Sequence, residues 1–449
     1  MPSAAEQLAA NLSWSSFSKA DELKKRILFA LGALIVYRVC TYIPLPGIDQ
    51  AALANMFNDM RGGFVDMINL FSGGGLSRMS IIALNIMPYI SASIIMQLMT
   101  SMVPTLAEMK KEGERGRQKI NQFTRYGTVL LTIVQAYGLA KGLESQAGVV
   151  FEPGFFFEFT TVVTLVGGTM FLVWLGEQIT QRGIGNGISL IIYAGIVAEL
   201  PGVFAQAFEL NRTNAMSLPM LLAILAGVAA MIWFIVLCES AQRKIKIQYP
   251  KRQQAHGGGM QDNSSHLPMK LNVAGVIPPI FASSLLMMPM TVAGFYAGAD
   301  APEWLAFVTA NIGPGKPIYI SLYILLIVFF CFFYTAIVFN PEETADNLKK
   351  HNGFVPGIRP GARTAEYLDY VLTRLTVIGS AYLSLICVVP ELIIAQSSVT
   401  FYLGGTSLLI VVNVTMDTVT QVQSHLFAQQ YDSLIKKSKL KSGKRGRVR

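Results

Sequence analysis

A series of ten apolar stretches, each about as long as a membrane-spanning helix, constrains the fold of this chain more than any other feature. A helix that crosses the hydrocarbon core of a bilayer needs about 20 apolar residues. Charged residues make up 14% of the chain, against about 25% in soluble domains. The sequence therefore predicts an all-α membrane protein with ten transmembrane helices, and it disfavours most soluble enzymes. The stretches lie at about 27–45, 79–103, 122–142, 155–176, 184–204, 218–238, 273–296, 317–339, 375–395 and 400–420.

Basic residues are distributed unevenly among the segments that connect these stretches. An even number of spans places both termini on one side, and 30 of the 36 Lys and Arg residues then fall on that side. Loops rich in Lys and Arg remain in the cytoplasm. We therefore expect both termini and the loops 104–121, 239–272 and 340–374 to be cytoplasmic. The net charge of +9 then belongs to these loops and the tail rather than to a nucleic-acid-binding face. Residues 1–26 lack a continuous apolar run, so we expect a retained first helix and no cleavable signal peptide.

The spans suggest two halves of five helices each. The second and the seventh span, near the start of each half, both carry polar residues and proline, which is typical of inverted-repeat membrane proteins. The predicted organisation is a cytoplasmic N-terminus (1–26), an N-terminal half (27–204), a connecting loop (205–217), a C-terminal half (218–420) and a basic cytoplasmic tail (421–449).

One apolar segment after the first span is too short to cross a membrane. Phe64–Phe71 would form about 12 Å of helix, far less than the roughly 30 Å of a bilayer core. Three glycines, Gly73–Gly75, follow it directly. The pattern over 64–75 predicts a half-helix on a hinge, outside the membrane or part-way into it.

The sequence contains no catalytic motif, and the predicted spans carry few charges. We noted Arg38, Glu158, Glu177 and Asp417, all near span ends. A secondary transporter usually keeps ionisable groups near the midplane, so this alternative is disfavoured. A membrane scaffold without transport is a second alternative, but it has no use for a hinged half-helix. The four cysteines lie in or beside apolar runs without metal-ligand spacing, so we expect no metal, no cofactor and no enzymatic activity.

Isoleucine pairs occur at helical spacing in two of the spans. Ile86 and Ile90, and likewise Ile188 and Ile192, are four residues apart and share a helix face. Such pairs are typical of lipid contact or core packing, and also of a hydrophobic constriction that excludes water and ions. Ser91, Ser93, Gln97 and Asn186 are polar residues at or near the same spans, where they suit either helix–helix hydrogen bonding or a seam that opens. Spacing alone does not separate these alternatives.

Long motifs along the chain resemble the SecY family, the pore subunits of the bacterial Sec protein-translocation channel. The resemblance covers roughly residues 20–436. Its motifs include PLPGID (44–49), LFSGGGLSRMSI (70–81), IMPYISASI (86–94), PTLAEMKKEGERGRQKINQFTRYGT (104–128), GEQITQRGIGNGIS (176–189), AGVIPPIFASS (274–284), FFYTAIVFNPEETADNLKK (332–350), VPGIRPG (355–361) and GGTSLLIVVNV (404–414). One departure is Asn85, where a small residue, usually glycine, is typical of the family.

This resemblance implies two five-helix halves around a central pore, with a short plug half-helix and a lateral gate between the second and seventh spans. It implies a channel that translocates unfolded preproteins and inserts membrane proteins laterally, closed at rest by an isoleucine ring and the plug. The implied pore ring is Ile86, Ile90, Ile188, Ile192, Ile280 and Ile410. The implied plug is Phe64, Met67, Ile68, Leu70, Phe71, Gly73, Gly74 and Gly75. The implied gate residues are Ser91, Gln97, Asn186 and Met288, and the implied docking residues are Arg243, Lys244, Lys251, Arg252 and Arg359.

The resemblance also implies a location and a set of partners. The location is the bacterial inner membrane, with SecE and SecG as companion subunits. The SecA motor ATPase and the ribosome would dock on the cytoplasmic loops, and signal sequences of preproteins would enter the channel. Membrane lipids, including anionic ones, would surround it, and SecDF and YidC are candidate further partners. A channel of this kind is passive, so the energy for transport must come from a partner.

Overall fold

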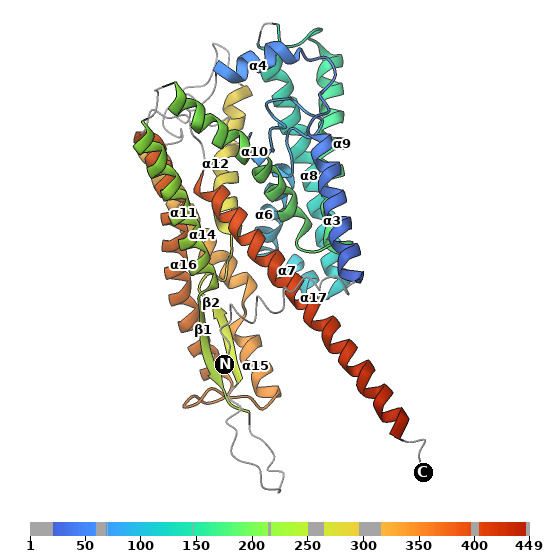
Figure 1. Cartoon of the computed structure of the whole chain (residues 1–449), viewed down its shortest axis with the longest axis vertical. Helices are drawn as coiled ribbons and strands as arrows, with labels where there is room; N and C mark the ends of the chain where they lie inside the picture. The colour runs from blue at the N-terminus through green and yellow to red at the C-terminus, as the bar shows by residue number, and fades with distance from the viewer. Residues whose placement is uncertain are drawn as a thin grey trace.

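The computed structural model describes residues 21–59, 69, 71–146, 148–213, 217–249, 265–295, 316–396 and 404–445, and most of them are helical. Long helices run beside one another along the long axis of the molecule (Figure 1). The elements in chain order are α3 (Asp21–Cys40), α4 (Gln50–Asp59), α6 (Met87–Met102), α7 (Pro104–Lys111), α8 (Glu114–Glu144), α9 (Phe155–Arg182), α10 (Gly187–Arg212), α11 (Leu218–Ser240), β1 (Gln242–Ile247), β2 (Ser265–Lys270), α12 (Ile277–Phe295), α14 (Pro317–Val338), α15 (Pro341–Lys350), α16 (Ala362–Gln396) and α17 (Gly405–Arg445).

Each of the ten predicted apolar stretches overlaps a helix among the described residues. By length and composition, five helical segments could cross a membrane: Phe155–Arg182, Gly187–Arg212, Leu218–Ser240, Pro317–Lys350 and Ala362–Ile393. A sixth arises if α6 and α7, which are bent by 97° relative to each other, count as one span. The structure therefore has several spanning helices, and the full count of ten stays a prediction.

The second predicted span differs from the helix that forms. We expected a helix from residue 79, but residues 72–86 form turns and α6 begins at Met87. Met79 and Asn85 adopt positive φ values of +40° and +49°, which a right-handed helix cannot accommodate. Pro88 lies in the first turn of α6, where its missing N–H leaves no helical hydrogen bond unmade.

The loop between α11 and α12 contains strand structure that the all-helical prediction missed. Strands β1 and β2 pair antiparallel, in a register from Gln242 opposite Lys270 to Ile247 opposite Ser265. Ile245 and Ile247 are buried, while the alternating Lys244 and Lys246 are exposed. A further antiparallel bridge joins Gln248 to Phe354 in the loop before α16, so the two long loops are connected to each other.

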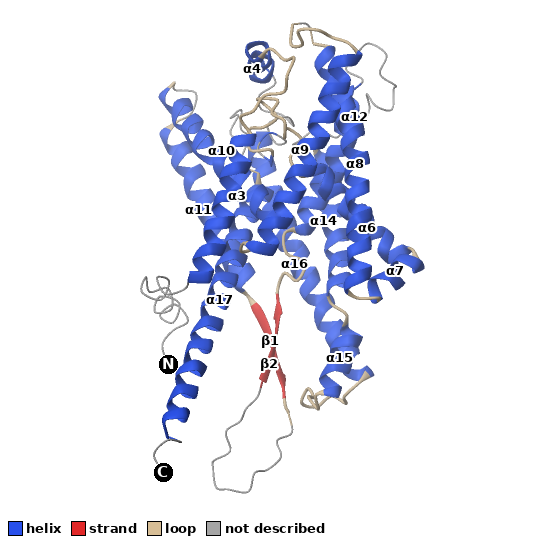
Figure 2. Cartoon of the chain, turned by 90° about the vertical axis from the view of Figure 1, so that its right-hand side faces the viewer, coloured by secondary structure: helices blue, strands red, loops and turns tan. Residues whose placement is uncertain are grey.

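The helices form two groups that meet along a seam. In the first group α6 and α9 pack against α8, and α3 and α10 pack against α9; in the second, α14 packs against α12 and α16, and α17 packs against α11 and α16. The groups meet where α12 contacts α6 and α8, and where α10 contacts α11 and α17. One continuous apolar core includes residues of both groups. The hairpin, α15 and the far end of α17 project from one end of the bundle, and α4 lies at the other (Figure 2).

Candidate functional site

Five isoleucine side chains from both helix groups surround one small cavity. They come from the turn before α6 and from α6, α10, α12 and α17, and Phe71 and Met87 also line the cavity. Its volume is about 10 Å³, and a single water molecule needs about 10–15 Å³. The seam is therefore closed at this level. The five residues are Ile86, Ile90, Ile192, Ile280 and Ile410.

Four of these five side chains are almost completely removed from solvent. Ile86 and Ile410 are each 1% exposed, Ile192 is 6% exposed and Ile90 is 8% exposed, whereas Ile280 is half-buried. Branched apolar side chains close on one another through dispersion contacts and need no hydrogen bonds. Separating the helices at this level therefore breaks no directional interaction between these residues.

Ile188, the sixth residue predicted for the ring, does not line this cavity. It lies in the first turn of α10 and is half-buried. Its side chain instead lies beside Gly176 of α9, where a Cβ placed on the glycine would come within 3.1 Å of an Ile188 side-chain carbon. The structure thus brings five of the six predicted ring residues together.

The cavity wall also contains polar side chains on one side. Asn85, Ser283 and Ser284 line it together with the isoleucines. The Ser283 hydroxyl donates to the Ile280 carbonyl (2.9 Å). The Ser284 hydroxyl is buried and has no hydrogen-bond partner among the described residues. The ring therefore borders a few polar groups of α12 and of the turn before α6.

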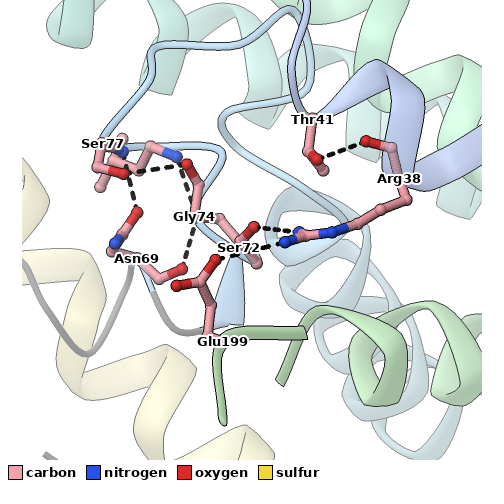
Figure 3. A network of polar contacts seen from close by, with 9 residues as sticks. Arg38, Thr41, Asn69, Ser72, Gly74, Ser77 and Glu199 are labelled. Carbon is pink, nitrogen blue, oxygen red and sulfur yellow. Dashed lines mark hydrogen bonds and ion pairs between the residues drawn. The ribbon is translucent and has the colours of Figure 1, made fainter. Parts of the chain in front are cut away.

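The glycine hinge at the end of the predicted plug is folded into a compact set of turns (Figure 3). The backbone N–H of Gly74 donates to the Asn69 carbonyl (2.9 Å), and that of Ser77 donates to the Asn69 side chain (2.9 Å). The Ser72 hydroxyl donates to the Asn69 carbonyl (3.0 Å) and accepts from the Leu76 N–H (3.1 Å). Asn69 therefore organises the turns around the hinge.

Of the predicted plug residues, Phe71 and the three glycines are described and buried. Phe71 lines the isoleucine cavity, which places the end of the predicted plug directly against the ring. Phe64, Met67, Ile68 and Leu70 lie outside the described residues, so the half-helix itself stays a prediction.

The predicted lateral-gate residues whose side chains are described make hydrogen bonds within or beside their own helices. The Ser91 hydroxyl donates to the Met87 carbonyl within α6 (3.2 Å). The Gln97 side-chain amide donates to the Ser93 hydroxyl (3.3 Å). Asn186 is exposed and caps α10 by accepting from the Ile188 N–H (3.2 Å). Met288 lies on α12, outside the residues whose side chains are described. The contact between α6 and α12 itself is present.

The predicted docking residues lie on two connected loops at one end of the bundle. Arg243 and Lys244 are exposed on β1, and Lys251 and Arg252 lie outside the described residues. Arg359 is exposed in the turn before α16, where its carbonyl accepts from the Thr364 hydroxyl (2.9 Å). Backbone hydrogen bonds in both directions between Gln248 and Phe354 (2.9 and 3.0 Å) join the two loops.

Sequence reasoning missed three acidic residues in or at the ends of the spanning helices. Glu239 is 6% exposed and Glu391 is 5% exposed, while Glu199 forms an ion pair with Arg38 (3.6 Å). Glu239 accepts from the Asn272 side chain (2.7 Å), which ties the end of α11 to the segment before α12. Glu199 and Glu391 lie inside predicted spans and Glu239 directly follows one, which was a usable signal, because an acidic side chain at such a position needs a partner.

The described part of the chain has the fold of protein-conducting channels. It resembles the solved structure of a protein conducting channel with a TM-score of 0.63, at 17% identity, covering 90% of this chain and 92% of that one. A second solved structure gives a TM-score of 0.61 at 18% identity, covering 90% of this chain and 92% of that one. It comes from work showing that the plug domain of the SecY protein stabilises the closed state of the translocation channel and maintains a membrane seal. Sec61 in the canine ribosome–channel complex from the endoplasmic reticulum gives 0.60 at 18% identity, covering 90% and 92%.

Sequence comparison narrows this class to one family. The sequence model of the SecY family matches residues 80–419. The protein translocase subunit SecY of Escherichia coli K12 is 55% identical over 423 residues, which cover 94% of this chain and 95% of that protein. The chain therefore belongs to the SecY family.

Proposed function

We propose that this chain is the central subunit of a gated channel through which unfolded preproteins cross the bacterial inner membrane and membrane proteins leave laterally into the lipid. The observation that carries the proposal is the closed isoleucine cavity on the seam between two helix groups, in a chain of the SecY family. A seam held by non-directional contacts can open and then close around any passing polypeptide. Among the described residues, no ionisable side chain lines the cavity, which favours a channel over a coupled transporter.

The finer architecture belongs to the same proposal. Ten spans in two inverted halves (27–204 and 218–420) surround the pore, and residues 64–75 form the plug. Ile188 is included in the ring when the channel closes around a polypeptide. The gate lies between α6 and α12, which are in contact here. Both termini are cytoplasmic, on the side of the hairpin and α15.

The partners follow from the two basic loops and from the family. SecA and the ribosome dock on the hairpin and on the Arg359 turn, because exposed Arg and Lys side chains suit an acidic protein surface or the phosphates of ribosomal RNA. The canine Sec61 relative was solved in a ribosome–channel complex, which supports a ribosome contact for this fold. SecE and SecG complete the membrane complex.

Reconstitution tests the proposal directly. The chain is incorporated into liposomes with SecE and SecG, and a preprotein, SecA and ATP are added outside. We expect preprotein to become protected from added protease only when both SecA and ATP are present. Protection without SecA, or ion-gradient-driven uptake of a small solute, would contradict a passive polypeptide channel. Liposomes that contain SecE and SecG without this chain serve as the control.

A further inference from the structure

The hinge Phe71–Gly75 is packed closely against α3 and α10. A Cβ placed on Gly73 would lie 2.9 Å from the Gly195 Cα and 3.0 Å from the Tyr37 hydroxyl. Gly73 also has a φ of +64°, a left-handed conformation that glycine adopts without strain. The backbone of the hinge therefore touches the backbone of α10, and side chains of its neighbours can reach the hinge carbonyls.

One set of contacts on the hinge comes from Arg38 at the end of α3. Its guanidinium donates to the Gly73 carbonyl (2.6 Å) and pairs with the Glu199 carboxylate of α10 (3.6 Å), as Figure 3 shows. The two side chains are only 26% and 24% exposed. Arg38 and Arg78 both stack on the ring of Tyr42, with guanidinium-to-centroid distances of 5.4 and 4.4 Å, respectively. Glu199 therefore offsets positive charge that two arginines concentrate beside the hinge.

A second contact comes from Asn85 in the turn before α6. Its side-chain amide donates to the Phe71 carbonyl (2.6 Å), and the residue is 2% exposed. Asn85 has a φ of +49°, which is uncommon for any residue except glycine, although asparagine tolerates it better than most. The backbone here suits glycine, so the side chain adds chiefly its hydrogen bond to the hinge.

We infer that Asn85 and the Arg38–Glu199 pair act together as a hinge lock, which holds residues 71–75 in the closed position and so sets how strong a signal sequence must be to open the channel. The inference rests on the proposed function. Both hydrogen bonds end on hinge carbonyls, those of Phe71 and Gly73. The Arg38 bond must break when the hinge moves away from α3 and α10, and the Asn85 bond must break when the hinge moves away from the turn before α6. Neither bond involves an isoleucine of the cavity. The lock therefore resists displacement of the hinge, and this resistance adds to the stability that the closed ring provides.

Two variants each remove one part of the lock: Glu199→Gln empties no volume, whereas Asn85→Gly leaves the space of one buried amide side chain. Glu199→Gln keeps the side-chain shape and removes the charge that orients Arg38. Asn85→Gly removes the amide and relieves the positive φ, whereas alanine would leave the strain in place. The matched control is Glu209→Gln on the same helix, because Glu209 pairs with Arg212 (2.8 Å) on an exposed surface away from the hinge.

The first readout is the export ratio of a preprotein with a defective signal sequence to one with an intact sequence, measured in the reconstituted complex. We expect this ratio to rise about tenfold in each lock variant, the effect of losing about 1.4 kcal/mol of closed-state stability. Glu209→Gln should stay within about twofold of wild type. A role in folding alone would instead lower export of both preproteins in parallel, and that result would overturn the inference.

The second readout does not depend on transport. Hydrogen–deuterium exchange is measured on amides of residues 74–80 in the purified complex, where Gly74, Leu76 and Ser80 donate within the hinge turns. We expect about tenfold faster exchange in both lock variants and no change in Glu209→Gln. Unchanged exchange in both variants would refute the lock. If exchange rises while wild-type liposomes fail to transport any preprotein, the proposed function is wrong and with it the role in signal-sequence selection, although the contacts do hold residues 71–75 in place.

Discussion

Replacing Ile410 with asparagine should strongly weaken the closed state of the channel. Ile410 is 1% exposed and lines a cavity of about 10 Å³. Burying an isoleucine side chain is worth about 1.5–3 kcal/mol. An amide buried there without a full set of partners costs a further 1–3 kcal/mol or so. The cavity has room for about one water molecule, so hydration recovers only part of this cost.

The net effect is a closed state less stable by about 3 kcal/mol, which corresponds to roughly a hundredfold increase in the open-to-closed ratio. Single-channel recording in planar bilayers, with no motor or preprotein present, measures this ratio as resting open probability. Ile410→Val is the matched control, because it removes one methylene and should cost about 0.5–1.5 kcal/mol. Equal effects of the two substitutions would show that lost volume matters and that polarity does not.

The same single-channel recordings test whether the isoleucine ring and the plug together form the seal. A chain lacking residues 64–75 should leak less than Ile410→Asn, or only intermittently, because nearby apolar side chains can partly replace the plug. Combining the deletion with Ile410→Asn should give the largest resting conductance. If the combined variant conducts no more than wild type, the seal lies elsewhere.

Three further predictions concern docking, topology and packing. Arg359→Glu should lower SecA-driven export at least several-fold while leaving the abundance of the complex unchanged, because Arg359 is exposed on a loop turn; normal export would argue for a solvated charge without a partner. A cysteine introduced at exposed position 266 on β2 should react with an impermeant thiol reagent only after the membrane is opened. The control is the parent chain with its own four cysteines. Labelling of position 266 in intact cells would show that the topology is the opposite one. Gly168→Ala should lower the melting temperature of the purified complex by several degrees, because the added Cβ would overlap the Ile81 carbonyl. The control is Gly167→Ala, which has open space around the added Cβ and should be neutral or slightly stabilising. Similar melting temperatures for both variants would contradict this packing.

Much of the helical framework could be predicted from the sequence because it depends on local properties. An apolar run of about 20 residues that crosses a bilayer forms a helix over most of its length, since its backbone polar groups must be satisfied within the segment. The i,i+4 spacing likewise placed Ile86 and Ile90 on one face, and both line the cavity. The start of α6 could not be located in this way, because positive φ at Met79 and Asn85 interrupts a stretch that is apolar throughout.

The remaining features depend on contacts between residues far apart in the chain. Asn85 was noted as a departure from the family, but its bond to Phe71 spans 14 positions and Arg38 reaches Gly73 across 35. Spacing gives no information on such pairs. The hairpin did leave a local signal, since Ile245 and Ile247 alternate with lysines at the period of a strand. The family resemblance supplied the ring as a set, yet only the packing against Gly176 shows why Ile188 stands apart.

Because α17 is one continuous helix, it can act as a lever arm between its far end and the isoleucine cavity. The helix runs unbroken from Gly405 to Arg445 and extends past the bundle (Figure 1), and its Gln421 side chain accepts from the Gly185 N–H (2.8 Å). At 1.5 Å per residue, Ile410 lies about 16 Å from this contact on one side and Arg445 about 36 Å on the other. If the rod pivots at Gln421, a sideways push on its far end moves Ile410 in the opposite direction by a little under half that distance, with correspondingly greater force. A weak, wide movement at the far end of α17 would in this way act with increased force on a tightly packed constriction.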